Sequence, residues 1–184
     1  MNRTSIAKYA CLLLIPMALF AFNNSKKPPK IADAPGLIEW TGIAGWTAKG
    51  DFTRWEFKKA KIPGGDFENV QIEVVVDMNS VNTENKDLEN HLRQMDYFGV
   101  KKFPLATITI DGAMKNEDGS YSAMAQFTIR EITQDIAIDF TVEGEEAPYT
   151  VKGSSEIQRK DFDISGDGPK NNVPLAFEVT IPAK

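Results

Sequence analysis

This chain of 184 residues contains only one histidine and one cysteine, His91 and Cys11. A catalytic triad or a Cys–His pair needs a nucleophile held beside a histidine base, so such chemistry is hard to build here. A lone cysteine also forms no disulfide within the chain. The stability of the fold must therefore come from a packed core.

The chain also lacks a long hydrophobic run. Its most apolar stretch, 9–22, has 14 residues, whereas about 20 are needed to span a bilayer. Arg3 and Lys8 precede this stretch and a polar segment follows it, a pattern typical of a secretory signal peptide. We expect a signal peptide over 1–21 and an exported protein, periplasmic or secreted.

Two alternatives concern the same N-terminal segment. Leu19 is larger than the residue usually found at its place before a cleavage site, so an uncleaved N-terminal anchor is the alternative to cleavage near Ala21. Lipidation at Cys11 is disfavoured because only two residues separate it from Lys8, too few for the apolar region that must precede such a site.

Concentrated positive charge is missing as well. The formal net charge is −5, and the only basic cluster comprises Lys26, Lys27 and Lys30. Nucleic-acid binding is therefore not expected. The polar, proline-containing segment 22–35 is predicted to be a flexible leader, and 36–184 a single domain.

What the chain has in abundance is two-residue alternation of apolar and polar side chains. Val70, Ile72, Val74, Val76 and Met78 alternate with mostly polar residues, which predicts a strand with one buried face. Similar patterns recur over 127–129, 136–142 and 175–181, with turn signals at 63–65, 116–119, 144–148 and 166–169. We predict an all-β fold in which six to eight antiparallel strands close into a β-barrel.

One short segment breaks this alternation. Leu88, His91, Leu92 and Met95 have helical spacing and form an apolar stripe, with Glu84, Lys86, Glu89 and Arg93 off it. We expect a single amphipathic helix covering a barrel mouth, where small-ligand sites often lie. For His91, packing of the helix and a hydrogen bond to a ligand head group both stay open.

Two further groups of residues are candidates for a site. Trp40, Trp46, Trp55, Phe52 and Phe57 either pack the core and barrel end or line a cavity. The segment 161–172 begins like a calcium loop, but Pro169 and Asn172 stand at positions nine and twelve, where a ligand and a bidentate glutamate belong. No metal site and no cofactor are predicted.

Several motifs together resemble the YceI-like polyisoprenoid-binding family over most of the chain beyond the leader. They are Thr83, His91-Leu92, Tyr97-Phe98 and Lys102-Phe103-Pro104, then 127–133 (FTIREIT) and 159–164 (RKDFDI). The chain departs from the family pattern at Glu131 and Asp163, where glycine is usual, and around 40–46.

The resemblance implies an extended antiparallel eight-stranded lipocalin-like β-barrel whose tunnel holds an isoprenoid lipid or quinone-like ligand, with a frequent homodimer. Delivery of such a lipid also implies transient membrane contact. No enzyme activity is expected. The candidate ligand-binding residues, each of which could equally be closed core, are Val74, Val76, Met78, Leu88, His91, Leu92, Met95, Phe98, Phe103, Phe127, Ile129, Ile138 and Phe140.

Two other functions stay open beside the carrier. The first is a cavity-less interaction or stress-related domain of the same fold. The second is an isomerase acting on a small apolar substrate, with Arg130, Arg159 and Asp161 as its polar groups.

Overall fold

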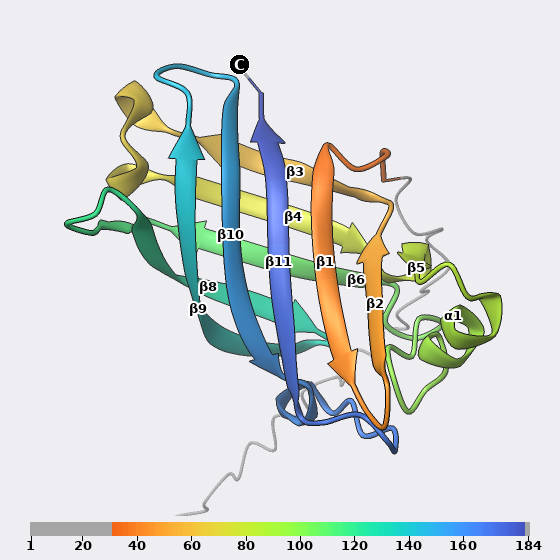
Figure 1. Cartoon of the computed structure of the whole chain (residues 1–184). Coiled ribbons are helices and arrows are strands. Elements are labelled where there is room, and N and C mark those ends of the chain that lie inside the picture. The colour runs from red at the N-terminus through yellow and green to blue at the C-terminus, as the bar shows by residue number, and fades with distance from the viewer. Residues whose placement is uncertain (1–30, 183–184) are drawn as a thin grey trace, which may run out of the picture.

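The computed structural model describes residues 31–182 and shows one strongly curled antiparallel sheet (Figure 1). In sheet order the main ladder runs β3-β4-β6-β8-β9-β10-β11-β1-β2-β5, and β7 pairs with β8. The strands are β1 (Gly36–Ile43), β2 (Thr47–Phe52), β3 (Trp55–Lys61), β4 (Gln71–Asp77), β5 (Val81–Asn82), β6 (Leu105–Asp111), β7 (Met114–Lys115), β8 (Tyr121–Ile129), β9 (Ile132–Glu143), β10 (Tyr149–Gln158) and β11 (Asn172–Ile181).

Curling brings the two halves of the sheet face to face. In Figure 1, β9, β10, β11, β1 and β2 run across β3, β4, β6 and β8, which lie behind them. The predicted all-β, antiparallel, lipocalin-like architecture is confirmed. The sheet has eleven strands where eight were expected, partly because β5 and β7 are two-residue strands that alternation cannot reveal.

The hydrogen-bonded ladder does not close into a full barrel, since β3 and β5 stand at its two ends. The short link between β2 and β3 joins these ends instead. The Thr53 amide donates to the Ser80 carbonyl at 3.2 Å, and the Asp77 amide donates to the Arg54 carbonyl at 3.0 Å. Backbone amides and carbonyls at the two ends of the sheet, which would otherwise lack hydrogen-bond partners, are thereby satisfied.

Helical structure is confined to short segments. The part of the chain that the structure describes has one α-helix, α1 (Lys86–Leu92), and the 3₁₀ turns η1 (Pro63–Gly65), η2 (Phe67–Asn69), η3 (Met78–Ser80) and η4 (Arg159–Phe162). The Asn85 side chain caps α1 by accepting hydrogen bonds from the amides of Asp87 and Leu88, at 3.1 and 3.2 Å. Within residues 31–182 no helix is long and apolar enough to cross a membrane.

The end of α1 corrects one expectation about the apolar stripe. The chain leaves the helix at Leu92 and turns back, so that the Phe98 amide donates to the Leu92 carbonyl at 3.0 Å. Met95 therefore lies beyond the helix and is 52% exposed. The helix does present Leu88 and Leu92 to the core, as the spacing predicts.

Glu89 departs further from expectation. It was placed off the apolar stripe, yet it is 2% exposed. Its carboxylate accepts hydrogen bonds from Lys86 at 2.9 Å and Arg93 at 3.3 Å. The hydrogen bond from Lys86 is the main cause that lowers the pKa of Glu89 below its ordinary value. Arg93 also donates to the Val81 carbonyl at 3.0 Å, which fixes α1 to β5.

The folded domain begins earlier than the sequence predicts, within the segment that was expected to be a flexible leader. The signal peptide expected over 1–21 lies outside the described residues, as does 22–30 of the leader. Residues 31–35 pack on the domain, because Ile31 is 3% exposed and the Ala34 amide donates to the Thr53 carbonyl at 3.1 Å. The folded unit thus includes the described end of the predicted leader.

Candidate lipid-binding cavity

The space enclosed by the curled sheet contains two adjoining cavities, which we call the distal and the proximal lobe. The distal lobe, of about 100 Å³, lies toward η2, and the proximal lobe, of about 120 Å³, lies toward α1 and η4. Both are bordered by Ile38, Ile108, Phe127 and Leu175. These four side chains therefore mark the junction of the lobes.

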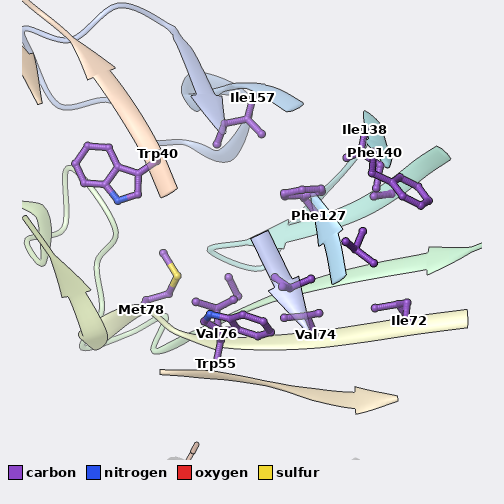
Figure 2. Close-up of a cluster of buried hydrophobic side chains, with 14 of the residues drawn as sticks. Trp40, Trp55, Ile72, Val74, Val76, Met78, Phe127, Ile138, Phe140 and Ile157 are labelled. Carbon is purple, nitrogen blue, oxygen red and sulfur yellow. The ribbon is translucent and has the colours of Figure 1, made fainter. Parts of the chain in front are cut away.

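The walls of both lobes are almost wholly apolar because each strand turns one alternating face inward. Figure 2 shows Ile72, Val74 and Val76 of β4 among side chains of β8 and β9, including Phe127, Ile138 and Phe140. Among residues 31–182, those bordering the distal lobe are aliphatic or aromatic except for Ser155. An apolar cavity of this kind stays dry and accepts hydrocarbon.

The proximal lobe includes one charged side chain, Arg159, which is 6% exposed. Three of the five N–H groups of its guanidinium donate to carbonyls, those of Ile164 at 2.7 Å, Pro169 at 2.9 Å and Lys170 at 3.1 Å. Arg159 thus ties η4 to the loop before β11.

A third, outer pocket of about 220 Å³ adjoins the proximal lobe, and we call it the vestibule. It lies between the β1–β2 hairpin, α1 and the loop at 167–169. Trp40, Leu92, Tyr97 and Pro169 border both the proximal lobe and the vestibule. The vestibule is therefore the mouth that the short helix was expected to cover.

Tyr97 makes both a hydrogen bond and an aromatic contact at this mouth. Its hydroxyl donates to the Asp167 carbonyl at 2.9 Å, and its ring lies 4.7 Å from that of His91. Burial raises the pKa of the Tyr97 hydroxyl above its ordinary value. Gly166 makes room for the ring, since a Cβ there would lie 2.9 Å from Cδ2 of Tyr97.

The structure places nine of the thirteen candidate residues around the two lobes. Leu92 also borders the vestibule, as do the candidates Leu88 and His91. The nine are Val74, Val76, Met78, Leu92, Phe98, Phe127, Ile129, Ile138 and Phe140. Whether they contact a ligand stays a prediction.

Two candidates lie outside all three spaces. Met95 points away because it follows the end of the helix. Phe103 is buried, but its ring packs under the guanidinium of Arg130 at 5.3 Å. Arg130 in turn donates to the carbonyls of Met95 at 2.8 Å and Tyr97 at 2.6 Å. Phe103 and Arg130 therefore hold the loop after α1 and do not line the cavity.

Sequence reasoning left out a large part of the lining. Trp40, Trp46, Trp55, Phe52 and Phe57, for which packing and lining were both open, all border a lobe or the vestibule. The alternation over 175–181 was recognised as a strand, yet its inward residues were not proposed as lining. Inward residues of other elements were missed as well. The lining residues that were not proposed include Ile38, Phe67, Ile108, Ile110, Val151, Ile157, Leu175, Phe177, Val179 and Ile181.

Glu131 and Asp163, which stand where the family usually has glycine, both have a left-handed backbone conformation. Arg130 and Glu131, with φ of 52° and 64°, form the two-residue turn between β8 and β9. Asp163, with φ of 57°, ends η4 and pairs with Arg130 at 3.2 Å. Glycine is the residue best suited to such backbone, which explains the family pattern at these positions.

The segment 161–172, considered for calcium, forms part of the wall of the mouth. The amides of Ser165 and Gly166 donate to the Asp96 carbonyl at 3.1 and 2.8 Å. Within residues 31–182 no group of three or more His, Cys, Asp or Glu side chains is arranged to hold a metal ion.

Solved structures with the same fold come from several bacteria. BcnA of Burkholderia cenocepacia superposes with a TM-score of 0.74 at 17% identity, covering 83% of this chain and 99% of BcnA. A polyisoprenoid binding domain from Saccharophagus degradans superposes with a TM-score of 0.63 at 14% identity, covering 84% of this chain and 97% of that domain. At these identities the likeness shows the fold alone.

Sequence comparison identifies the family. The UPF0312 protein YE1254 of Yersinia enterocolitica is 31% identical over 108 residues, and a UPF0312 protein of Yersinia pestis is 32% identical over the same length. Each match covers 54% of this chain, which spans about half the length of these curated relatives. The pattern that defines the YceI-like domain matches residues 36–183. The chain therefore belongs to the YceI-like family.

Proposed function

We propose that this protein is a carrier that encloses the prenyl chain of an isoprenoid lipid in the distal and proximal lobes. The observation that carries the proposal is the pair of adjoining apolar cavities inside the sheet. Burial of each CH₂ group is worth about 0.8 kcal/mol, so a chain of several isoprene units needs no polar contact to be held. The solved domain from Saccharophagus degradans, described as polyisoprenoid binding, has the same fold.

The polar residues considered for an isomerase support binding over catalysis. Arg130 and Arg159 are buried and engaged with backbone carbonyls. Asp161 is exposed. None of these three groups is presented to the apolar lobes as a free acid or base, and a general acid or base must reach the substrate.

We further propose that the protein is exported and works in the periplasm or outside the cell. This part rests on the charged, apolar and polar regions of the first 30 residues. Transient contact with a membrane, where such a lipid would be loaded or delivered, and a homodimer are predictions that belong to the same proposal.

Ile108 provides a direct test because it borders both lobes, whereas its neighbour Thr109 is exposed on the other face of β6. Ile108→Trp places an indole at the junction of the lobes, and Thr109→Trp is the matched control on the same strand. We expect Ile108→Trp to lower the affinity for geranylgeraniol, measured by titration calorimetry, by at least tenfold. Thr109→Trp should bind like the wild type.

Both variants must first be shown to be folded, since overpacking a core costs about 1–3 kcal/mol of stability. Circular dichroism and urea unfolding provide that check. Unchanged affinity in a folded Ile108→Trp variant would contradict binding inside the lobes. Absence of binding to the wild type would contradict the carrier function itself.

A further inference from the structure

The wall of the distal lobe is not a continuous hydrogen-bonded sheet on every side. Trp55 of β3 borders this lobe, and so do Val179 and Ile181 of β11. In the sheet described for residues 31–182, β3 stands at one end of the ladder and is not paired with β11. On this side the lobe is therefore closed by side chains and by the chain that crosses between the two strands.

The crossing chain is the segment 31–35, which we call the strap. At one end of the strap, the Thr180 amide of β11 donates to the Pro35 carbonyl at 3.3 Å. Toward the other end, the Ala34 amide donates to the Thr53 carbonyl, in the link between β2 and β3, at 3.1 Å. Figure 1 shows this segment leaving the start of β1 and running toward that link. The strap thus joins β11 to the start of β3.

The two supports of the strap are fixed more firmly than the strap itself. Gly36, at its root, lies so close to β11 that a Cβ would come within 2.7 Å of Val179 Cα. In the link, Arg54 Nη2 donates to the Asp77 carboxylate at 2.7 Å, and the Arg54 amide donates to Ser80 Oγ at 3.0 Å. The strap can therefore move while the sheet stays in place.

The other boundaries of the cavity are held by more contacts. Strands β10 and β11 pair along ten residues each. At the mouth the Tyr97 hydroxyl donates to the Asp167 carbonyl, and Arg159 donates to three carbonyls. At the opposite end the Phe67 ring packs 5.1 Å from that of Tyr149. A segment at the start of a domain with few hydrogen bonds opens at a lower free-energy cost than such elements do.

We propose that the strap closes a side entrance to the distal lobe, through which the prenyl chain enters and leaves. This inference rests on the proposed function, because it names the route into the same cavity. A chain that enters from the side need not be threaded past Trp40, Leu92 and Tyr97 at the mouth. Ile31 is 3% exposed and Ala34 packs against the core, so apolar contacts hold the strap shut.

A disulfide that locks the strap provides the test. Asp33 and Arg54 lie opposite each other in an isolated antiparallel β-bridge, a separation that a disulfide can span. Asp33→Cys/Arg54→Cys is made in the full chain with Cys11→Ser, and its oxidised and reduced forms are compared. Ser122→Cys/Asp139→Cys is the matched control, because these two residues lie opposite each other in the continuous β8–β9 ladder.

Stopped-flow fluorescence of all-trans-retinol, an isoprenoid alcohol, measures the rates of binding and release. We expect oxidation of the strap pair to slow both rates about fivefold or more and to change Kd less than about twofold, because a gate alters the barrier in both directions. Oxidation of the control pair should leave both rates unchanged. Ile31→Asp, which charges the buried end of the strap, should speed both rates, whereas Leu37→Asp, at an exposed position of β1, should not.

The outcomes separate the strap from the carrier function. A strap disulfide that is confirmed by mass spectrometry and leaves both rates unchanged would refute the side entrance while leaving the carrier function in place. Unchanged rates in a folded Ile31→Asp variant would do the same. If the wild type binds neither retinol nor geranylgeraniol, the carrier function is refuted and this inference with it.

Discussion

The size of the lobes predicts how affinity depends on the length of the prenyl chain. The lobes have volumes of about 100 and 120 Å³, and one water-sized sphere takes about 10–15 Å³. Together they hold about fifteen to twenty such spheres, which corresponds to about three to four five-carbon isoprene units. Each five-carbon unit that is buried inside the lobes contributes about 4 kcal/mol to the free energy of binding, at about 0.8 kcal/mol for each CH₂ group removed from water.

Part of that gain is lost because the bound chain is ordered. We therefore expect the affinity for prenyl alcohols to rise at least tenfold per unit from two to about four units, and less than threefold for each unit beyond. Titration calorimetry with geraniol, farnesol, geranylgeraniol and geranylfarnesol measures this series. An affinity that rises by the same factor from the fourth unit to the fifth, or that does not change from the second to the fourth, would refute the reasoning from cavity volume.

Two further predictions concern stability and are measured by urea unfolding. Glu131→Gly should raise the free energy of unfolding by up to about 1 kcal/mol, because Glu131 has a φ of 64° and a left-handed conformation is strained for residues with a Cβ; a loss of stability would show that the glutamate side chain matters more. Glu89→Gln should destabilise the protein at pH 7, with the difference from wild type shrinking as pH falls. The folded-state pKa of Glu89 is lowered from 4.5, chiefly by Lys86, so its stabilising effect is present above pH 4.5 and is lost as pH falls through the lowered pKa; a difference that persists at pH 2 would contradict this.

The strands were predictable because alternation reflects which face of a strand is buried. The inward residues Val74 and Val76 follow that rule, and β4 begins and ends within one residue of the alternating pattern. Val75 does not follow it. It was assigned to the polar face, yet it is 6% exposed, so β4 is buried on both faces at this point. Alternation describes one strand and carries no information about what covers its outer face.

The helix was predicted in place and type but not in its details. Its spacing correctly placed Leu88 and Leu92 against the core. The burial of Glu89 depends on Lys86 and Arg93 converging on one carboxylate, with Arg93 also tied to the Val81 carbonyl. Such an arrangement follows from the packing of α1 on β5, which helical periodicity does not specify.

The cavity was the least predictable feature. Inward-facing residues such as Phe127 look the same in sequence whether they close a core or border a space, because packing density is a property of the whole enclosure. The aromatic residues of the first strands carried a usable signal. Trp40 beside Gly42 and Gly50 in a hairpin indicates that an indole lies against backbone, and Gly50 does allow this close approach in the structure.

The most direct test of the carrier function is native mass spectrometry of the full chain, purified without added lipid from a quinone-producing host and followed by organic extraction. We predict a folded protein carrying one adduct per chain, with a mass that the extract identifies as an isoprenoid lipid. A folded protein whose mass shows no adduct, and which takes up no isoprenoid lipid when one is supplied, would contradict the account.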